Sequence, residues 1–306
     1  MTETSAPRPA SWRGWLTDPN PTSPAQANLH QLWRMWRKLC RNHSALLGLG
    51  ILLVIMLAAV FAPLLATHDI YVQNLGNRLA LPSADHWLGT DELGRDIYSR
   101  LLFGARITLY IAGLTAVISA PVGLILGTVS GYFGGWVDTV IMRVTEIFLA
   151  FPSLILALAF VSALGPGINN AVIAISLTAW PPIARLARAE TMIIRRSDYV
   201  SAVRMQGASG LRIITRHIMP MCLTSVVARV TLNMASIILS AAGLGFLGLG
   251  AQPPSPEWGA MLSSARQFIL SNGYVAAAPG IAILMTSVAF NLFGDGLRDV
   301  LDPRHD

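Results

Sequence analysis

The sequence predicts an all-α integral membrane protein with six transmembrane helices. Of the 306 residues, 53% are apolar and only 12% are charged, whereas soluble domains carry about 25% charged residues. The apolar residues also gather in runs about as long as the roughly 20 residues that cross a bilayer as a helix. A soluble fold would have to bury several such runs, so the composition argues strongly against it.

The apolar runs give the expected crossings. In chain order they are 45–66, 107–132, 147–184, 222–249 and 268–294. The third run is long enough for two crossings if it breaks at its GPGINN sequence, because Gly and Pro mark turns. The fourth run holds one charge, at Arg229. Six crossings place both termini on the same side of the membrane.

The distribution of Lys and Arg predicts which side that is. Sixteen of the 22 Lys and Arg residues fall on the side of the N-terminus, chiefly in the tail 1–44 and the loop 185–220, and five fall on the other side. Because positive residues accumulate on the cytoplasmic side, we expect both termini to be cytoplasmic. This asymmetry accounts for the net charge of +6, so no nucleic-acid partner is expected.

The first 44 residues are predicted to be a polar cytoplasmic tail that ends in an interfacial amphipathic helix. The stretch LHQLWRMWRKLCR, 29–41, mixes Trp33 and Trp36 with basic residues, a pattern typical of a helix in the plane of the membrane interface. A simpler interpretation, a charge anchor for the first crossing, stays open. Cys40 and Cys222 are both expected near the cytoplasmic face, so no disulfide is predicted.

Several classes of enzyme lack their residues in this chain. The only lysine is Lys38, so no GxxxxGK phosphate loop exists. No HExxH sequence is present, the six histidines are scattered, and no metal site is expected. The FGDG sequence, 293–296, is similar to a motif of intramembrane aspartyl proteases, but the apolar runs hold no second acid. The chain is therefore not predicted to be an enzyme.

An ion-coupled secondary transporter or a channel is the alternative from another class. Such proteins place ionisable groups or broken helices near the middle of the membrane. Arg229 is the one ionisable residue inside an apolar run. Snorkelling to the cytoplasmic interface and a role in the interior both stay open for its side chain.

A basic segment with two glycines, YVSAVRMQGASGLRIITRHIMP at 199–220, lies between two crossings. Ser197 or Asp198 is expected to cap a short helix, Gly207 to supply the turn, and a second helix to begin near Leu211. A rigid helix-turn-helix on the cytoplasmic side would offer a contact for a soluble partner. An ordinary basic loop is the alternative interpretation.

The spacing in this segment resembles the EAA loop of ABC importer permeases. That pattern runs Glu-Ala-Ala, then a glycine four residues after the last alanine, then a hydrophobic-Pro close. Ser201 stands in place of the glutamate and Val203 in place of the second alanine. In that family the short helix docks into a groove on the ATPase subunit. The resemblance implies a coupling loop with contributions from Tyr199, Ser201, Ala202, Val203, Gly207, Ala208, Ser209 and Pro220.

Three further segments are similar to the C-type permeases of the peptide and nickel branch. They are LGTDELGRDIYSRLLFGARITL at 88–109, LGFLGLGAQPPSPEWGAML at 244–262 and FNLFGDGLRDVLDP at 290–303. The resemblance implies a type I importer fold, with a five-helix core in 107–294 that follows an N-terminal helix. It also implies a periplasmic segment at 67–106 and a cytoplasmic C-terminus at 295–306.

The outer segments are expected to form a periplasmic or gate motif. Thr90 is predicted to cap a helix in which Asp96 and Arg100 pair at i,i+4 spacing. A metal site of Asp91, Glu92 and Asp96 is conceivable, but salt bridges are the favoured interpretation, and Trp258 fits an interfacial belt. The motif comprises Gly89, Thr90, Asp91, Gly94, Arg95, Asp96, Arg100, Glu257 and Trp258.

Charged residues close the sequence beside the expected cytoplasmic exit, at Asp295, Arg298, Asp299 and Asp302. A surface ion-pair cluster and a contact with the ATPase explain this pattern equally well.

The resemblance also implies the partners. They are a homologous B-type permease subunit, two cytoplasmic subunits that bind ATP and Mg, a periplasmic substrate-binding protein and membrane lipid, with no cofactor in this chain. It implies a location in the bacterial inner membrane and import of dipeptides or oligopeptides. Nickel, metal chelates and glutathione are the alternative cargoes.

Overall fold

The computed structural model describes residues 23–301, and every regular element among them is a helix. The predicted all-α fold is confirmed. The elements are α2 (Pro24–Arg41), α3 (His43–Val60), α4 (Ala62–Leu65), η1 (Leu75–Asn77), α5 (Ile97–Phe133), α6 (Gly135–Ala150), α7 (Ser153–Leu164), α8 (Ile168–Ile194), α9 (Asp198–Met205), α10 (Gly210–Ile213), η2 (Ile214–Ile218), α11 (Met219–Phe246), α12 (Trp258–Ala265), η3 (Arg266–Phe268) and α13 (Gly273–Leu301).

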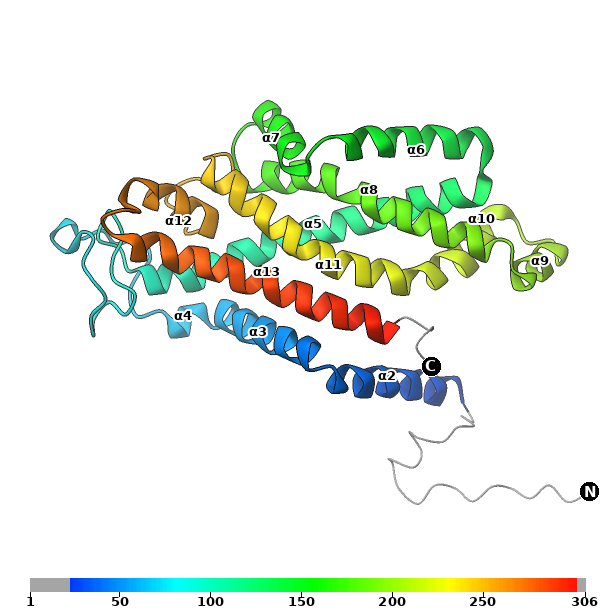
Figure 1. Ribbon diagram of the computed structural model, residues 1–306, viewed down its shortest axis with the longest axis horizontal. Helices are drawn as coiled ribbons and strands as arrows, with labels where there is room; N and C mark the ends of the chain where they lie inside the picture. Colours follow the sequence, from blue (N-terminus) through cyan, green and yellow to red (C-terminus); the bar gives the residue numbers. More distant parts are fainter. Residues whose placement is uncertain (1–22, 302–306) are drawn as a thin grey trace, which may run out of the picture.

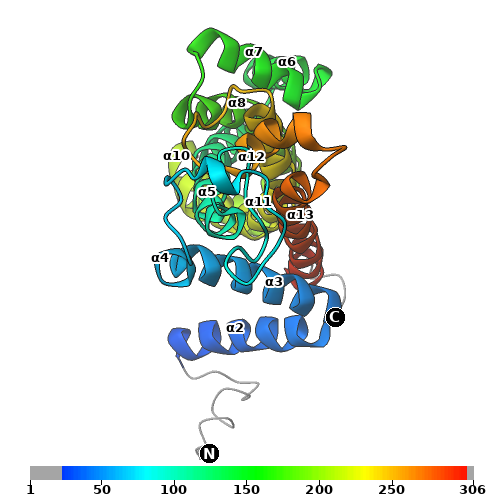
Figure 2. The same ribbon diagram turned by 90° about the vertical axis from the view of Figure 1, so that its left-hand side faces the viewer.

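Four long helices, α5, α8, α11 and α13, run along the long axis of the molecule (Figure 1). α5 packs against α8, α11 contacts α5, α8 and α13, and α3 packs against α13 and α5. The short helices α9 and α10 lie at one end of this bundle, and α12 with the segment 67–96 lies at the other (Figure 1). Seen from the second end, α2 and α3 lie together on one side of the bundle (Figure 2).

Close approach of α5 and α8 depends on glycines one turn apart on α5. A methyl group at Gly123 would lie 2.6 Å from Cβ of Ile183, and one at Gly131 would lie 2.7 Å from Cβ of Thr191. Gly127, between them, faces Ala184 and Ala187 in the same way. Small residues of this kind let membrane helices pack by backbone contact, since lipid supplies little hydrophobic drive for their association.

Four helical segments are long and apolar enough to cross a membrane, and the α6–α7 pair makes a fifth if that bent pair is a single span. The four are 43–60, 97–133, 210–246 and 273–301. Each corresponds to a predicted crossing, so a polytopic membrane protein is confirmed. The number six stays a prediction, because α8 is 27 residues long but is not among the segments that are apolar enough.

The crossing that was expected to start at residue 147 is wrong both in where its helix begins and in its direction. α6 already begins at Gly135, and the chain bends by 95° between α6 and α7. Pro152 cannot continue the hydrogen bonds of α6, and Phe151 before it is extended, with φ −100° and ψ 144°. The predicted break at GPGINN is present, since α7 ends at Leu164 and α8 begins at Ile168.

Other expected boundaries also move. The run 45–66 is divided at Phe61 between α3 and α4, where Pro63 lies in the first turn of α4. The Arg106 guanidinium donates to the carbonyls of Ala59 and Val60, and so satisfies acceptors that the end of α3 leaves free. α5 begins at Ile97, not at residue 107.

The last helix differs from its expected range at both ends. α13 begins at Gly273, because residues 266–272 form η3 and a turn, and it continues to Leu301. The described part of the expected C-terminal segment 295–306 is therefore helical.

The amphipathic stretch near the N-terminus is helical as predicted, and α2 extends from Pro24 to Arg41. The Ser23 hydroxyl accepts a hydrogen bond from the Gln26 amide at 3.2 Å and caps this helix. Trp36 is 54% exposed, which suits a helix with one face toward an interface. Residues 1–22 of the predicted polar tail lie outside the described residues.

We predict that Gly123→Ala lowers the melting temperature of the detergent-solubilised full chain. The added methyl group overlaps Ile183, and overpacking of this kind costs about 1–3 kcal/mol. Gly113→Ala is the matched control on the same helix, because nothing lies within 4 Å of its added methyl group, and alanine is the better helix former. Equal melting temperatures for the two variants would contradict the close-packing account.

Candidate functional site

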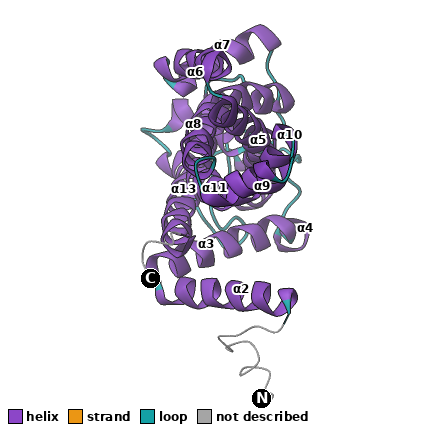
Figure 3. Cartoon of the chain, turned by 90° about the vertical axis from the view of Figure 1, so that its right-hand side faces the viewer, coloured by secondary structure: helices purple, strands orange, loops and turns teal. Residues whose placement is uncertain are grey.

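The segment between α8 and α11 forms a helix-turn-helix at one end of the bundle (Figure 3). The Ser197 hydroxyl accepts from the Val200 amide at 3.4 Å, so Ser197 is the N-cap of α9. Gly207 has φ +84°, a left-handed value that residues with a Cβ seldom adopt. The Ser209 hydroxyl accepts from the Arg212 amide at 3.4 Å and caps α10, which begins at Gly210. The predicted cap, turn and second helix are present.

One face of this helix-turn-helix is fixed to the bundle by apolar packing. Val200, Ile213 and Ile218 are fully buried together with Cys222 of α11, and Tyr132 of α5 packs against them. Because interiors pack closely, α9 cannot shift on this face without displacing its neighbours. The helix-turn-helix is thus a rigid projection of α5 and α11.

Two arginines add polar contacts at the same place. Arg195 Nη1 donates to the carbonyls of Gly131 and Tyr132 at 2.8 and 3.0 Å, so it satisfies acceptors at the end of α5. The guanidinium carbon of Arg204 lies 5.7 Å from the centroid of the Tyr132 ring, which is within the range of cation–π attraction. Both contacts tie the α9 region to α5.

The opposite face is open. Of the residues predicted for the coupling loop, Val203 and Ala208 are partly buried against the apolar cluster. The exposed members are Tyr199, Ser201, Ala202, Gly207, Ser209 and Pro220. Met205 and Leu211, which sequence reasoning missed, are 90% and 69% exposed on either side of the Gly207 turn. Both apolar side chains are therefore open to contact by a partner protein.

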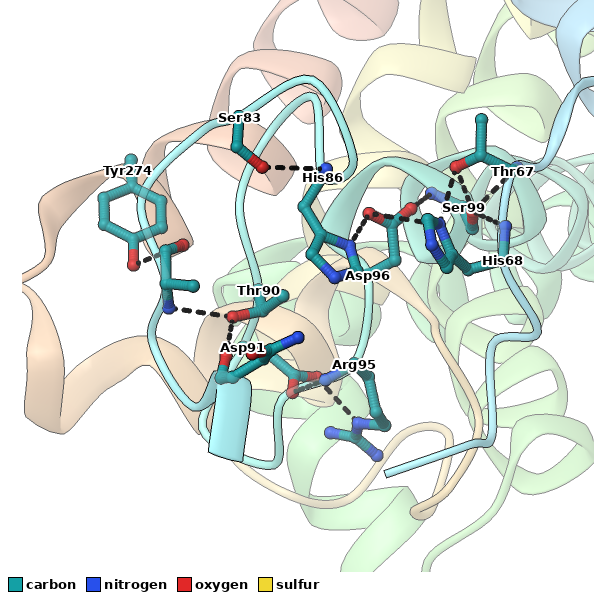
Figure 4. Close-up of polar contacts among 12 residues, drawn as sticks. Thr67, His68, Ser83, His86, Thr90, Asp91, Arg95, Asp96, Ser99 and Tyr274 are labelled. Carbon is teal, nitrogen blue, oxygen red and sulfur yellow. Dashed lines mark hydrogen bonds and ion pairs between the residues drawn. The ribbon is translucent and has the colours of Figure 1, made fainter. Parts of the chain in front are cut away.

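Ion pairs organise the other end of the bundle (Figure 4). Asp91 Oδ2 lies 2.7 Å from Arg95 Nε and 3.4 Å from Arg100 Nε, and Arg95 Nη2 lies 3.2 Å from Glu92 Oε1. Arg100 also donates to the carbonyls of Ile70 and Pro254, at 3.0 and 3.4 Å. This buried guanidinium therefore joins three separate segments. Asp91 and Glu92 therefore take part in salt bridges, which is the interpretation that the sequence favoured over a metal site.

Two expected contacts in this region are wrong. Thr90 does not cap α5, since its hydroxyl accepts from the Ala80 amide at 2.8 Å and donates to the Asn77 carbonyl. The cap is Asp96, whose Oδ2 accepts from the Ser99 amide at 2.7 Å. As an extended N-cap residue, Asp96 does not face Arg100 as an i,i+4 partner within a helix would.

Gly89 and Gly94 lie in the turns before α5, and both have positive φ, at 77° and 72°. They bring the chain back on itself, so that Thr90 and Asp96 form an isolated antiparallel bridge.

Glu257 and Trp258 begin α12 and are both buried. The Glu257 carboxylate accepts from the amides of Gly259 and Ala260, each at 2.9 Å, and from the Thr108 hydroxyl at 3.5 Å. Burial raises the pKa of the Glu257 carboxyl above its ordinary value. Glu257 therefore ties α12 to α5.

The expected place of Trp258 in an interfacial belt is wrong, because the side chain is only 2% exposed. Its Nε1 donates to the Leu101 carbonyl at 3.0 Å, and its ring lies over Gly104 of α5. The absence of a side chain at Gly104 makes room for the indole.

The C-terminal charges lie on the last turns of α13. Asp295, Arg298 and Asp299 are all exposed, and no ion pair joins the three to one another within the described residues 23–301. Asp302 lies outside that range. These three residues alone do not form the expected ion-pair cluster, and their contact with an ATPase stays a prediction.

Comparison with known proteins identifies the class. Residues 123–306 match the family described as binding-protein-dependent transport system inner membrane component. Residues 31–82 match the N-terminal transmembrane domain of oligopeptide transport permease C.

Curated relatives match most of the chain. The dipeptide transport system permease protein DppC of Alkalihalophilus pseudofirmus is 44% identical, with 94% of this chain and 96% of that protein covered. The probable D,D-dipeptide transport system permease protein DdpC of Escherichia coli is 46% identical over 83% of this chain and 85% of that protein. The glutathione transport system permease protein GsiD of Escherichia coli is 43% identical over 90% of both chains.

A solved structure shows the same fold. An inward-facing structure of the MetNI methionine ABC transporter superposes with a TM-score of 0.53 and 20% identity, covering 66% of this chain and 96% of that chain. The chain belongs to the family of inner-membrane components of binding-protein-dependent transport systems. It is a permease subunit of an ABC importer, that is, a transport component of the membrane.

We predict that Gly207→Val abolishes most import by the assembled transporter, while Gly207→Asn retains a larger share. The two side chains are similar in size, and nothing lies within 4 Å of a Cβ at this position. Asn tolerates the left-handed conformation, whereas the β-branched Val does not. Import and membrane content of each variant are measured together. Wild-type import by a normally assembled Gly207→Val transporter would contradict the role of the turn.

We predict that Glu257→Ala lowers the melting temperature of the full chain in detergent more than Glu257→Gln does. Alanine leaves two amides and the Thr108 hydroxyl without their buried acceptor. Each buried polar group that loses its partner costs about 1–3 kcal/mol. The Gln side-chain oxygen keeps an acceptor at the N-cap. Equal melting temperatures for both variants and the wild type would show that the cap contributes nothing to stability.

Proposed function

We propose that this chain forms half of the translocation pathway of an ATP-driven importer of short peptides. The observation that carries the proposal is the rigid helix-turn-helix at 197–220, whose inward face is packed on α5 and whose outward face is open. Relatives over nearly the whole chain are named as dipeptide and D,D-dipeptide permeases. Dipeptides and oligopeptides are therefore the first class of cargo.

The energy for import comes from partner subunits. Two cytoplasmic ATPases bind ATP and Mg, and the exposed face of α9 contacts one of them, with Met205 and Leu211 as apolar anchors beside Ser201 and Ala202. This chain itself binds neither ATP nor Mg. The exposed residues Asp295 and Arg298 lie at the end of α13 and face the cytoplasm, as does the N-terminus.

The pathway itself needs a second subunit. α5 carries exposed apolar residues along its length, including Val117, which is 69% exposed, and Ile125, which is 49% exposed. A homologous B-type permease covers part of this surface, and inner-membrane lipid covers the rest. Arg229 is exposed on α11 in the single chain, where both snorkelling and a place in the shared path agree with its position.

A periplasmic binding protein docks at the opposite end, near α12 and the ion-paired segment 67–96. ATP binding and docking shift the pair of permeases between inward-open and outward-open states. Each ligand must bind one state more tightly than the other for such a shift to occur.

Glutathione is the second candidate cargo, because a glutathione permease is 43% identical over 90% of this chain. Nickel and metal chelates are the remaining cargo alternatives for this architecture.

We predict that Ala202→Cys forms a cross-link to the cytoplasmic ATPase in membranes, whereas Leu81→Cys at the other end of the bundle does not. Both positions are exposed, so labelling by a small thiol reagent is the control for reactivity. Cys40→Ser in both backgrounds removes the partly exposed native thiol. The proposal fails if Leu81→Cys cross-links to the ATPase and Ala202→Cys does not.

A further inference from the structure

Two histidines and one aspartate meet at the start of α5. His68 follows α4, His86 lies in the loop before α5, and Asp96 is the N-cap of α5. One ligand atom from each, an imidazole nitrogen or a carboxylate oxygen, lies within 4.8 Å of the other two. Figure 4 shows both imidazoles turned toward the Asp96 carboxylate. Scattered positions in the sequence gave no sign of this cluster.

The spacing suits one small cation. His86 Nδ1 lies 2.9 Å and His68 Nδ1 lies 3.9 Å from Asp96 Oδ1. A Zn²⁺ ion with ligands at about 2.0–2.2 Å places tetrahedral ligand atoms about 3.3–3.6 Å apart, and the two observed distances lie on either side of this range. Imidazole and carboxylate are both common ligands of Zn²⁺.

The backbone on which the three ligands stand is already fixed. The Ser99 hydroxyl accepts from the amides of Thr67 and His68 at 3.2 and 3.1 Å, and so holds the chain after α4 on the first turn of α5. The Ser83 hydroxyl accepts from the His86 amide at 3.1 Å. Preorganised backbone of this kind reduces the ordering that a bound ion would otherwise require.

Charge also favours a cation at this place. The side chain of Asp96 is fully buried, and its carboxylate lies against His68 and His86. The neighbouring arginines, Arg95 and Arg100, pair with Asp91. A buried carboxylate that faces two imidazoles is therefore available to compensate the charge of a metal ion.

Access to the cluster is open on one side. The His68 side chain is 40% exposed, and residues 66–71 line a pocket of about 500 Å³ beside it. Three protein ligands leave the fourth position of a tetrahedral site for water or for a ligand in this pocket.

We propose that His68, His86 and Asp96 form a Zn²⁺ site that links the segment after α4 and the loop before α5 to the first turn of α5. The site lies at the end of the bundle opposite α9 (Figure 1), and the inference does not rest on the proposed import function, because Zn²⁺ binding is measured without any import. The bound ion stabilises this end of the molecule, as does any ligand that binds only the folded state.

The test measures Zn²⁺ binding to the purified full chain, without a polyhistidine tag, by calorimetry and metal analysis. Wild type and the control His43→Ala, which removes an exposed histidine at the start of α3, are expected to bind one Zn²⁺ with equal affinity. His68→Ala and His86→Ala are expected to bind at least about tenfold more weakly. Zn²⁺ should raise the melting temperature of wild type and leave that of His68→Ala unchanged.

Two results would overturn the proposal: no binding to wild type at micromolar Zn²⁺, or wild-type affinity in His68→Ala. X-ray absorption of the Zn²⁺-loaded wild type gives an answer that needs no variant. Two imidazoles and oxygen around the ion support the site, whereas sulfur ligands would assign the ion to Cys40 or Cys222.

Discussion

The close packing of α5 against α8 is the contact on which the rest of the structure depends. Lipid supplies little hydrophobic driving force for helices to associate. Close backbone contact at Gly123, Gly127 and Gly131 therefore supplies the packing energy. α5 is 37 residues long and runs through the whole bundle. Its first turn holds the Asp96 cap, and its last turn carries Tyr132 beneath α9. Both ends of the molecule are therefore built on one helix.

The two ends use different chemistry for the same purpose. At the α9 end, buried Val200 and Ile213 fix the helix-turn-helix, and Arg195 satisfies the carbonyls at the end of α5. At the α12 end, the buried guanidinium of Arg100 and the carboxylate of Glu257 join loops to α5. Both ends of the molecule are therefore attached rigidly to the same helix, α5.

Features that depend on local sequence could be predicted. The all-helical fold, the apolar spans, the break before α8 and the turn at Gly207 follow from hydropathy, Gly and Pro alone. Pro152 indicates the bend at Phe151, but the residues on both sides are apolar, so hydropathy does not show that the chain changes direction there. Two features could not be predicted, because each brings together residues that are distant in the sequence. They are the burial of Trp258 over Gly104 and the cluster of His68, His86 and Asp96.

Hydropathy alone also does not determine the number of crossings. α8 has a polar start and arginines in its second half. Its buried face packs against α5. A helix inside a bundle need not be as apolar as one that lipid surrounds.

Uptake of a labelled dipeptide, compared between cells that lack this chain and the same cells with it restored, tests the central claim most directly. We predict that uptake is lost with the chain, returns with it, and is not reduced by excess glutathione or nickel. Unchanged uptake in cells without the chain, with labelled glutathione uptake lost instead, would contradict the dipeptide assignment. It would make glutathione the cargo of the same permease.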